Sequence, residues 1–443
     1  MAFSVRGTLR RPLQAALALA LALCATAACR SEPAPAPPPP VAERAWVQLS
    51  GRGVEARLIT GARTCPVMKV DGKPLPMRQR AGPGPAFPVT VCQALLPPRA
   101  VRASIGAIPL ALPHGPPQRI LIFGDTGCRL KGAAVQKCAN PPDDPRAWPF
   151  AEVSRLAAAH HPDLIIHVGD YYYRESPCPA GRSGCEGSPW GDNWATWDAD
   201  FFAPATPLLA AAPWVMVRGN HESCARGGAG WFLLLDAGLA PRACPAIAAP
   251  YAVPIGGLNL YILDSADTND TVAPADAVAA FGAQLDALRL PLATRPGWII
   301  THRPFWGLAP VLRLGPIGPL EAPLNATQQA AARRRSLAAV RMVVSGHVHH
   351  FASFSFGARR PAQLIVGTGG DIGESGDTPR FRAQTVSLDG MTASNFGFGR
   401  YGFLLMERAG GAWQGAFYDL DDHVIARCRL IARNLTCGPA TGP

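Results

Sequence analysis

The sequence has little charge for its length, and almost none of its positive charge comes from lysine. Only 16 % of the 443 residues are charged, and lysine supplies 4 of the 42 basic side chains. A chain so rich in Arg, Ala, Pro and Gly is typical of GC-rich coding, so its formal net charge of +11 is a weak indication of a polyanionic partner. We therefore predict no specific nucleic-acid partner.

Two further absences narrow the class of protein. After residue 28 no segment is long and apolar enough to span a membrane, which takes about 20 residues in a helix. No two cysteines have the Cys-x-x-Cys spacing that is common in structural zinc sites. A hydrophobic content of 48 % instead suits a globular protein with a sizeable core.

Residues 1–28 have the pattern of a signal peptide. Three arginines in the first eleven residues precede an Ala- and Leu-rich stretch, and small residues stand before the expected cleavage point. Residues 26–29 also resemble a bacterial lipobox, in which Cys29 would carry a lipid, although threonine fits its first position poorly. We expect an exported protein that is periplasmic, lipid-anchored in the bacterial envelope or secreted, and that meets a membrane only through such a lipid.

Ten cysteines remain once Cys24 and Cys29 are assigned to the leader and its cleavage point. In an exported chain an even number of cysteines predicts disulfides. The sequence leaves their connectivity open, but closing short loops is the simplest assignment. It pairs neighbours along the chain: Cys65 with Cys92, Cys128 with Cys138, Cys178 with Cys185, Cys224 with Cys244, and Cys428 with Cys437.

Composition divides the rest of the chain into three regions. Residues 29–42 are rich in Pro and Ala and predict an extended linker. Residues 43–114 combine short alternating apolar patterns with many Pro and Gly residues, which predicts a small N-terminal β-domain. From 115 to 443 apolar runs alternate with helical segments, so we predict an α/β layered fold. Strands are expected at 119–123, 164–168, 214–217, 258–263, 298–301 and 342–345, and helices at 150–159, 275–290 and 327–339.

Five short polar motifs lie far apart in the chain, and most directly follow one of these strands. They are Asp125-Thr126-Gly127, Gly169-Asp170-Tyr171-Tyr172-Tyr173, Gly219-Asn220-His221-Glu222, Thr301-His302 and Gly346-His347-Val348-His349. Gly-Asp is common in turns and a tyrosine run is common in strands, whereas the third and fifth motifs are much rarer by chance. Ligands of α/β sheets bind beyond the carboxyl ends of the strands. The motifs therefore predict one site for two metal ions about 3.5–4 Å apart, bridged by the Asp170 carboxylate.

In residue types and order the motifs resemble the calcineurin-like metallophosphoesterases, and Tyr173 makes them similar to the purple acid phosphatase branch. The resemblance covers roughly residues 119–410 and implies a layered β-sandwich flanked by helices. It also implies that Asp125, Tyr173 and His349 complete the coordination of the first ion, and that Asn220, His302 and His347 bind the second. Carboxylates and a phenolate suit Fe(III), and the imidazole-rich side suits Fe(II), Zn(II) or Mn(II).

One departure from many relatives affects the expected chemistry. Many relatives have a histidine that assists the leaving group at the position of Gly127. The purple acid phosphatases, like this sequence, have a glycine there. The resemblance then makes His221, next to Asn220, the leading candidate for a hydrogen-bond donor or general acid. The implied reaction is hydrolysis of a phosphate monoester, in which a metal-bound hydroxide attacks phosphorus in line. No serine, cysteine or further carboxylate is placed to form a phosphoenzyme.

Two other functions stay open. A phosphodiesterase of the same fold, acting on nucleotides, nucleic acid or lipid head groups, would share the metal ligands, and the aromatic loop 171–205 would help to set access. A non-catalytic phosphate-binding envelope lipoprotein is less favoured, because a decayed enzyme usually loses ligands and all seven are present. Arg218 and Arg303 lie next to ligands, where structural ion pairing is at least as reasonable as contact with phosphate.

Overall fold

The computed structural model describes residues 41–139, 144, 146–238, 243–313, 319–372 and 381–440. The predicted signal peptide, Cys29 and residues 29–40 of the predicted linker lie outside the described residues. Among the described residues no helix is both long enough and apolar enough to cross a membrane. From Val41 onward the chain forms one compact unit.

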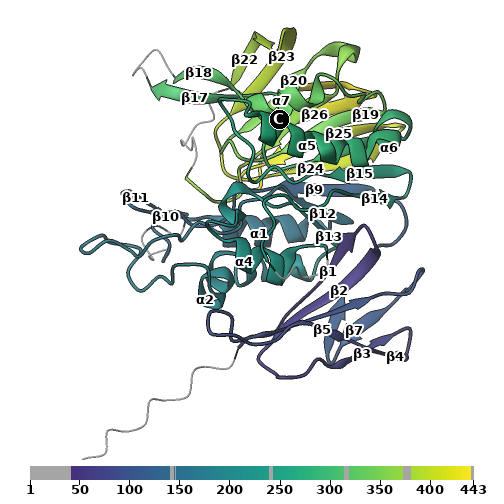
Figure 1. Cartoon of the computed structure of the whole chain (residues 1–443), viewed down its shortest axis with the longest axis vertical. Coiled ribbons are helices and arrows are strands. Elements are labelled where there is room, and N and C mark those ends of the chain that lie inside the picture. The colour runs from purple at the N-terminus through teal and green to yellow at the C-terminus, as the bar shows by residue number, and fades with distance from the viewer. Residues whose placement is uncertain are drawn as a thin grey trace, which may run out of the picture. The chain divides into compact units, whose positions relative to one another are not determined.

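An 11-stranded sheet carries the first three motifs (Figure 1). Its order is β27 (Asn434–Pro439), β26 (Val424–Ile431), β25 (Ala412–Tyr418), β24 (Phe403–Ala409), β9 (Arg119–Phe123), β12 (Leu164–His167), β13 (Trp214–Met216), β1 (Arg44–Ser50), β2 (Gly53–Thr60), β6 (Thr90–Leu95) and β5 (Arg78–Ala81). At its centre β9, β12 and β13 are parallel, so their carboxyl ends meet at one edge of the sheet.

An 8-stranded sheet carries the last two motifs. Its order is β14 (Tyr251–Ile255), β15 (Leu258–Ile262), β16 (Gly297–Ile300), β19 (Val340–Ser345), β21 (Ala362–Val366), β20 (Phe351–Ser355), β23 (Met391–Phe398) and β22 (Arg382–Leu388). The run from β15 through β16 and β19 to β21 is parallel. This sheet therefore has its own edge of carboxyl ends.

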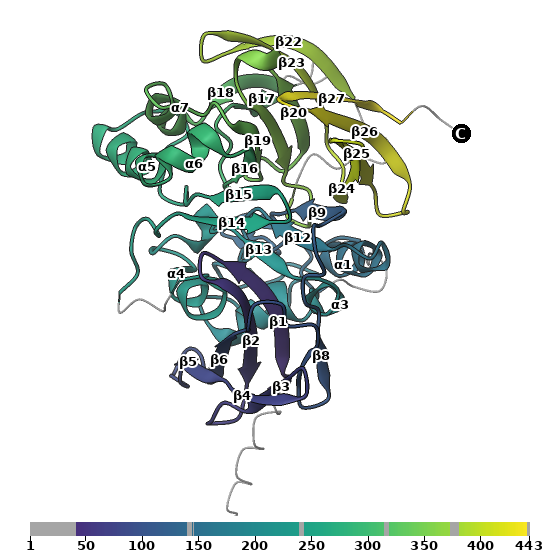
Figure 2. The same ribbon diagram turned by 90° about the vertical axis from the view of Figure 1, so that its right-hand side faces the viewer.

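The two sheets pack against each other and helices cover their outer faces (Figure 2). Ile122 and Trp298 belong to one buried cluster drawn from both sheets, whereas their neighbours Phe123 and Ile299 join separate clusters with the helices. This alternation explains the continuous apolar runs, because these strands are covered on both sides. On one side lie α1 (Phe150–Ala159), α2 (Trp194–Trp197), α3 (Thr206–Leu209) and α4 (Gly228–Gly230), and on the other α5 (Ala275–Ala287), α6 (Arg289–Thr294) and α7 (Ala326–Ala332). The predicted α/β layered fold with an N-terminal β region is confirmed.

The region 43–114 is built of strands and shares a sheet with the residues that follow it. Gln48 of β1 pairs in parallel with Trp214 of β13, and this bond attaches β1, β2, β6 and β5 to the 11-stranded sheet. A further sheet contains β4 (Lys73–Pro76), β3 (Val67–Val70), β7 (Ala103–Ile105) and β8 (Ile108–Leu110). The regions before and after the domain boundary expected near residue 114 are thus joined by backbone pairing in one sheet.

The remaining elements are short and lie in the connections. They are the two-stranded ribbons β10 (Leu130–Lys131) with β11 (Ala134–Val135) and β17 (Gly307–Arg313) with β18 (Pro319–Leu324), the π-helical turns η1 (Asp198–Phe202) and η3 (Trp231–Leu235), and the 3₁₀ turns η2 (Asn220–Glu222) and η5 (Gly357–Arg359). The helix expected at 327–339 is wrong in length, because α7 ends at Ala332. The chain turns at the following arginines and enters β19 at Val340, which must pair with Gly297 of β16.

Five disulfides confirm the oxidised cysteines, and each joins neighbours along the chain. The pairs are Cys65–Cys92, Cys128–Cys138, Cys178–Cys185, Cys224–Cys244 and Cys428–Cys437. This is the pairing that short loops favoured. Five disulfides are typical of an oxidising, extracytoplasmic environment.

Candidate metal centre

The ends of five parallel strands bring the motifs to one place. Asp125, Asp170 and Asn220 follow β9, β12 and β13 of the 11-stranded sheet, while His302 and His347 follow β16 and β19 of the 8-stranded sheet. Because the two sheets are stacked, side chains from both carboxyl edges converge. The seven predicted ligands meet there, as the distances below show.

The backbone at the site is held in an uncommon conformation. Asp125, Asp170 and His347 have φ values of 58°, 59° and 72°, in the left-handed region that non-glycine residues seldom occupy. Gly169, with φ of 102°, has no room for a side chain, because a Cβ atom would lie 2.5 Å from Nδ1 of His302. Such strain persists only where the surrounding structure enforces it, and it is concentrated at functional sites.

The first cluster contains Asp125, Asp170 and His349, whose ligand atoms all lie within 4.8 Å of one another. Tyr173 stands among them. Its hydroxyl is 2.7 Å from Oδ2 of Asp170, 3.1 Å from Nε2 of His349 and 3.3 Å from Oδ1 of Asp125. All four side chains predicted for the first ion therefore point at one position.

The second cluster contains Asp170, His302 and His347, again within 4.8 Å. Nε2 of His302 lies 3.2 Å from Oδ2 of Asp170 and 3.0 Å from Oδ1 of Asn220. Asp170 belongs to both clusters, which is the geometry required of a bridging carboxylate.

The pKa values of the side chains at the site are consistent with the binding of two cations. Burial, followed by the charges of Asp170, Asp371 and Asp125, raises the pKa of Tyr173 well above its usual value, so the phenol would ionise only on a metal. Burial lowers the pKa of His349, but Asp371 and Asp125 outweigh it and raise that pKa to about 9. The carboxylates thus draw positive charge into the clusters. A set of carboxylates, imidazoles, an amide and a phenol is a reasonable donor set for two ions of the predicted kinds.

Glu222 ties two of the motifs together. Its side chain is fully buried and accepts four backbone N–H groups, those of Tyr171 (2.8 Å) and Tyr172 (3.0 Å) on Oε1 and those of Asp170 (3.0 Å) and Gly219 (2.9 Å) on Oε2. Burial and the charge of Asp170 raise the pKa of Glu222 to about 8, although hydrogen bonds from Tyr172 and Tyr171 oppose this shift. The third motif thus holds the bridging carboxylate of the second motif in position.

Tyr173 also explains why residue 127 is glycine. A Cβ atom at Gly127 would lie 2.8 Å from Cδ2 of Tyr173 and 2.7 Å from the carbonyl oxygen of Tyr171. A histidine at this position would therefore clash with the tyrosine. Asp200 fixes the same loop, because it accepts the backbone N–H of Tyr173 at 2.8 Å and the Arg174 side chain at 2.5 Å.

His221 lies at the first cluster within a charged group that the sequence did not indicate. Oε1 of Glu175 is 2.6 Å from Nδ1 of His221, close enough for an ion pair although poorly aligned for a hydrogen bond. Arg226 contacts Oε1 of Glu175 at 2.5 Å and Nε2 of His221 at 3.3 Å. The imidazole lies 3.8 Å from the Tyr173 ring, centroid to centroid. Burial lowers the pKa of His221, and the charge of Asp170 opposes this.

Arg303 and Asp270 make a corresponding group at the second cluster. Nη1 of Arg303 lies 2.5 Å from Oδ2 of Asp270 and 3.1 Å from Nε2 of His347. The same oxygen of Asp270 is 3.1 Å from that nitrogen. Asp270 is therefore placed to orient the His347 ring, a role in which a carboxylate commonly supports a metal-binding histidine. Only the position of Arg303 next to His302 could have been read from the sequence.

The side chain of His349 is oriented by a third such carboxylate. Its Nδ1 lies 3.1 Å from Oδ2 of Asp371 and 2.8 Å from the carbonyl oxygen of Ile372. Asp371 also accepts the Nε–H of Arg129 at 3.0 Å. These partners come from loops without a recognisable motif, and no pattern in the sequence could have identified them.

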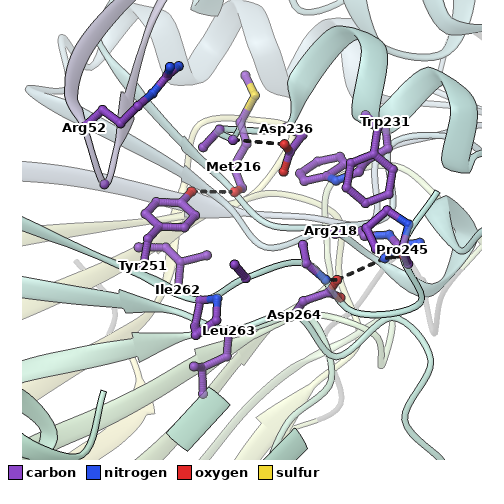
Figure 3. Close-up of a pocket in the computed structure, with 17 residues that line it drawn as sticks. Arg52, Met216, Arg218, Trp231, Asp236, Pro245, Tyr251, Ile262, Leu263 and Asp264 are labelled. Atoms are coloured by element: carbon purple, nitrogen blue, oxygen red, sulfur yellow. Dashed lines mark hydrogen bonds and ion pairs between the residues drawn. The ribbon is translucent and has the colours of Figure 1, made fainter. Parts of the chain in front are cut away.

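Arg218 is a structural residue and lines a separate cavity (Figure 3). The cavity has a volume of about 330 Å³ and contains none of the predicted ligands. Arg218 pairs with Asp264 at 3.0 Å and donates to the carbonyl oxygen of Glu222 at 2.9 Å. It thereby stabilises the turn that contains Asn220.

Two stacked sheets that share a carboxylate between two metal-competent clusters define the class of metallophosphoesterases. A family model described as calcineurin-like phosphoesterase matches residues 118–351, just over half of the chain. The chain belongs to this family of metal-dependent phosphoric ester hydrolases, and the family expected from the motifs is confirmed. A set of candidate ligands with this fold implies two metal ions.

The fold agrees with that of a solved structure, PhoD. The structure of PhoD shares 13 % identity with a TM-score of 0.53, and the match covers 90 % of this chain and 92 % of that one. The purple acid phosphatase PPD1 from yellow lupin (Lupinus luteus) seeds shares 14 % identity with a TM-score of 0.49, covering 90 % of this chain and 74 % of that one. A search of curated proteins finds no significant match.

Proposed function

We propose that the protein is an exported phosphatase of the purple acid type that hydrolyses phosphate monoesters. One observation carries the proposal: the Tyr173 hydroxyl lies within 3.3 Å of Asp125, Asp170 and His349. A phenol in this position is the feature by which the motifs resemble the purple acid phosphatases. Gly127 adds support, because it leaves the space that the tyrosine ring needs.

We assign Asp125, Tyr173 and His349 to the first ion, Asn220, His302 and His347 to the second, and Asp170 to both. A carboxylate and a phenol around the first position suit Fe(III), and the imidazoles around the second suit Fe(II), Zn(II) or Mn(II). When bound, the two ions would neutralise the phosphate and lower the pKa of a water molecule.

The protein's own side chains would orient the ester and handle its proton. His221 is our candidate general acid, and Glu175 would act as its positioning residue from 2.6 Å. In the described geometry Arg226 donates towards Nε2 of His221, so this nitrogen is an acceptor before substrate arrives. A phosphate oxygen that draws Arg226 away would free Nε2 of His221 to take up a proton from solvent, and the imidazolium could then donate this proton to the departing alkoxide. Arg303, at the second cluster, is held by Asp270 through Nη1 next to His347, and its Nε has no hydrogen-bond partner among the described residues.

The leader pattern and the disulfides support a periplasmic or lipid-anchored protein of a bacterial envelope. The residues that would decide between cleavage and lipidation are Cys29 and its neighbours, which lie outside the described residues. Mass spectrometry of the mature N-terminus would decide between the two, because a diacylated Cys29 differs in mass from a simple cleavage product.

The test of function compares a nitrophenyl phosphate monoester with the bis-nitrophenyl diester, using mature protein loaded with iron and zinc, from acid to neutral pH. Faster turnover of the monoester supports the proposal. Faster turnover of the diester would overturn it in favour of a phosphodiesterase of the same fold. Turnover of neither, with both ions bound, would favour a phosphate-binding protein.

A further inference from the structure

A pocket rich in arginine lies at the opposite end of the strands from the metal centre. It has a volume of about 460 Å³, and we call it the arginine pocket. Its charged side chains are Arg333, Arg335, Arg359, Arg360, Arg433 and a single carboxylate, Asp389.

The topology separates this pocket from the metal centre. Residues 336–338 and 359–361 line it, and these directly precede the first residues of β19 and β21. His347 and the other ligands follow the last residues of the parallel strands. Six residues of β19 at about 3.3 Å each place the two ends roughly 20 Å apart. Phosphate bound in the arginine pocket would therefore not contact the metal ligands.

The pocket contains more positive charge than its single carboxylate and the neighbouring Asp286 can balance. Asp389 accepts Nε of Arg333 at 2.7 Å and lies 3.4 Å from Nη1 of Arg360. Arg335 pairs outside the pocket with Asp286 at 2.6 Å. Arg359 is exposed and forms no ion pair with any described residue. Five guanidinium groups against two carboxylates leave three positive charges around one cavity.

Arg433 has an unused donor in this pocket. Its two terminal nitrogens donate to the carbonyl oxygens of Ala358 and Leu337, at 3.3 and 3.4 Å, while its buried Nε has no partner among the described residues. Burial lowers its pKa. An unpaired donor on a partly buried cation is costly, and an oxyanion would supply both the acceptor and the charge.

Two of the guanidinium groups, those of Arg335 and Arg360, are also held in place before any ligand arrives. The Cζ atom of Arg360 lies 4.7 Å from the centroid of the Trp306 ring and 4.8 Å from that of Phe356. Arg335 donates to the carbonyl oxygen of Ala331 at 2.7 Å, one turn earlier in the chain. Fixed guanidinium groups lose little conformational entropy when they bind, and their fork of donors matches the oxygens of a phosphate group.

We propose that the arginine pocket binds a phosphate-type oxyanion, either free phosphate or the phosphate of a lipid head group. This site is separate from the metal centre and adds a binding function to the proposed hydrolysis. Surface arginines without a ligand are the alternative, and the two are distinguished by binding rather than by turnover.

The experiment titrates the metal-loaded protein with inorganic phosphate in a calorimeter and repeats the titration after chelation. We expect a binding event that survives chelation and that Arg359→Gln weakens at least about tenfold, the effect of losing one charge-assisted hydrogen bond. Arg433→Gln should act in the same direction. Arg155→Gln is the matched control, because Arg155 is an exposed arginine of α1 that pairs only with Glu152 among the described residues, and it should leave the event unchanged.

Vesicles of phosphatidylglycerol in phosphatidylcholine distinguish the two sources of phosphate. One outcome is that the protein sediments with these vesicles. If Arg359→Gln abolishes this sedimentation and free phosphate competes with it, the ligand is a lipid head group. A chelation-resistant phosphate event without vesicle binding would identify free phosphate. The proposal is wrong if phosphate binds only through the metals and the vesicles do not bind. Turnover of the nitrophenyl monoester, measured on the same Arg359→Gln protein, should equal that of the unmodified protein and reports separately on the proposed hydrolysis.

Discussion

Replacing Glu222 by glutamine should destabilise the protein and weaken metal binding, although Glu222 is not a proposed ligand. The carboxylate accepts two backbone N–H groups on each oxygen. Glutamine keeps one oxygen, and its amide group turns two hydrogens towards two N–H donors. Each buried donor left unpaired costs about 1–3 kcal/mol, so the free energy of unfolding should fall by roughly 2–6 kcal/mol.

The same change should loosen the bridging carboxylate. Whichever oxygen is replaced, the lost pair of hydrogen bonds includes the N–H of Asp170 or that of its neighbour Tyr171. A residue that orients a metal ligand typically contributes about 10–100-fold to metal affinity. Zinc competition with a chelator of known affinity measures this in native protein, and denaturant unfolding of the disulfide-intact chain measures stability.

Glu152→Gln is the matched control for this prediction. Glu152 lies in the first turn of α1 and pairs with Arg155 at the surface, so its loss should change stability by no more than about 0.5 kcal/mol. If Glu222→Gln unfolds at the same denaturant concentration as this control and binds zinc equally well, the hydrogen bonds of Glu222 do not hold the two motifs together.

Three further predictions concern the metal ligands and their partners. Asp170→Ala should bind neither ion and lose all turnover, and elemental analysis that still finds two ions would disprove the bridging assignment. Tyr173→Phe should lose the visible charge-transfer band of the iron-loaded protein, whereas a band that persists would show that the phenolate is not a ligand. Glu175→Gln should lower turnover about 10–100-fold with the metal content unchanged, because it leaves His221 unoriented; the pH profile should shift as well, and an unaltered profile would mean that Glu175 has only a structural role.

The sequence could indicate a common site for the candidate ligands because most of their motifs directly follow a strand. Two carboxyl edges collect the side chains that come directly after β9, β12, β13, β16 and β19, so the chemistry of short motifs is enough to indicate a site. Asp270, Asp371 and Glu175 could not be predicted in this way. Their positions depend on how irregular loops fold back on the ligands, and a single carboxylate in a loop has no periodic signal.

The fold was predicted at the level of layers but not of long-range pairing. Apolar runs identified the strands, because both faces of the central strands are covered. The attachment of β1 to β13 joins residues far apart in sequence, and no local pattern specifies it. The expected helix 327–339 failed for a similar reason. Apolar alanines and good helix formers continue past Ala332, but β19 must begin at Val340 to pair with β16, and this tertiary requirement ends the helix early.

The carboxylates around the site divide into two kinds according to their partners, and this division indicates where the cations belong. Glu222 has each oxygen occupied by two backbone N–H groups, and Asp200 likewise has both oxygens occupied by backbone and arginine donors. Both oxygens of each of these carboxyl groups therefore already have hydrogen-bond donors from the protein. Asp170 receives one backbone N–H on Oδ1, while the described neighbours of its Oδ2 include the Tyr173 hydroxyl, the His302 imidazole and, at 4.0 Å, Nε2 of His221.

The phenol of Tyr173 and the imidazole of His302 compensate Oδ2 of Asp170 by directing their protons towards it, and a metal ion at this position would displace those protons. Burial is the largest cause of the raised pKa of Tyr173, and the charge of Asp170 adds to it; for His302, burial lowers the pKa, but Asp170 raises it to about 9. Two cations next to Asp170 would release these protons and turn the same side chains into ligands. Metal binding should therefore release protons, and calorimetric titration with zinc in two buffers of different ionisation enthalpy measures their number. A proton release that is the same in the protein and in Tyr173→Phe would show that the phenol does not ionise on binding zinc.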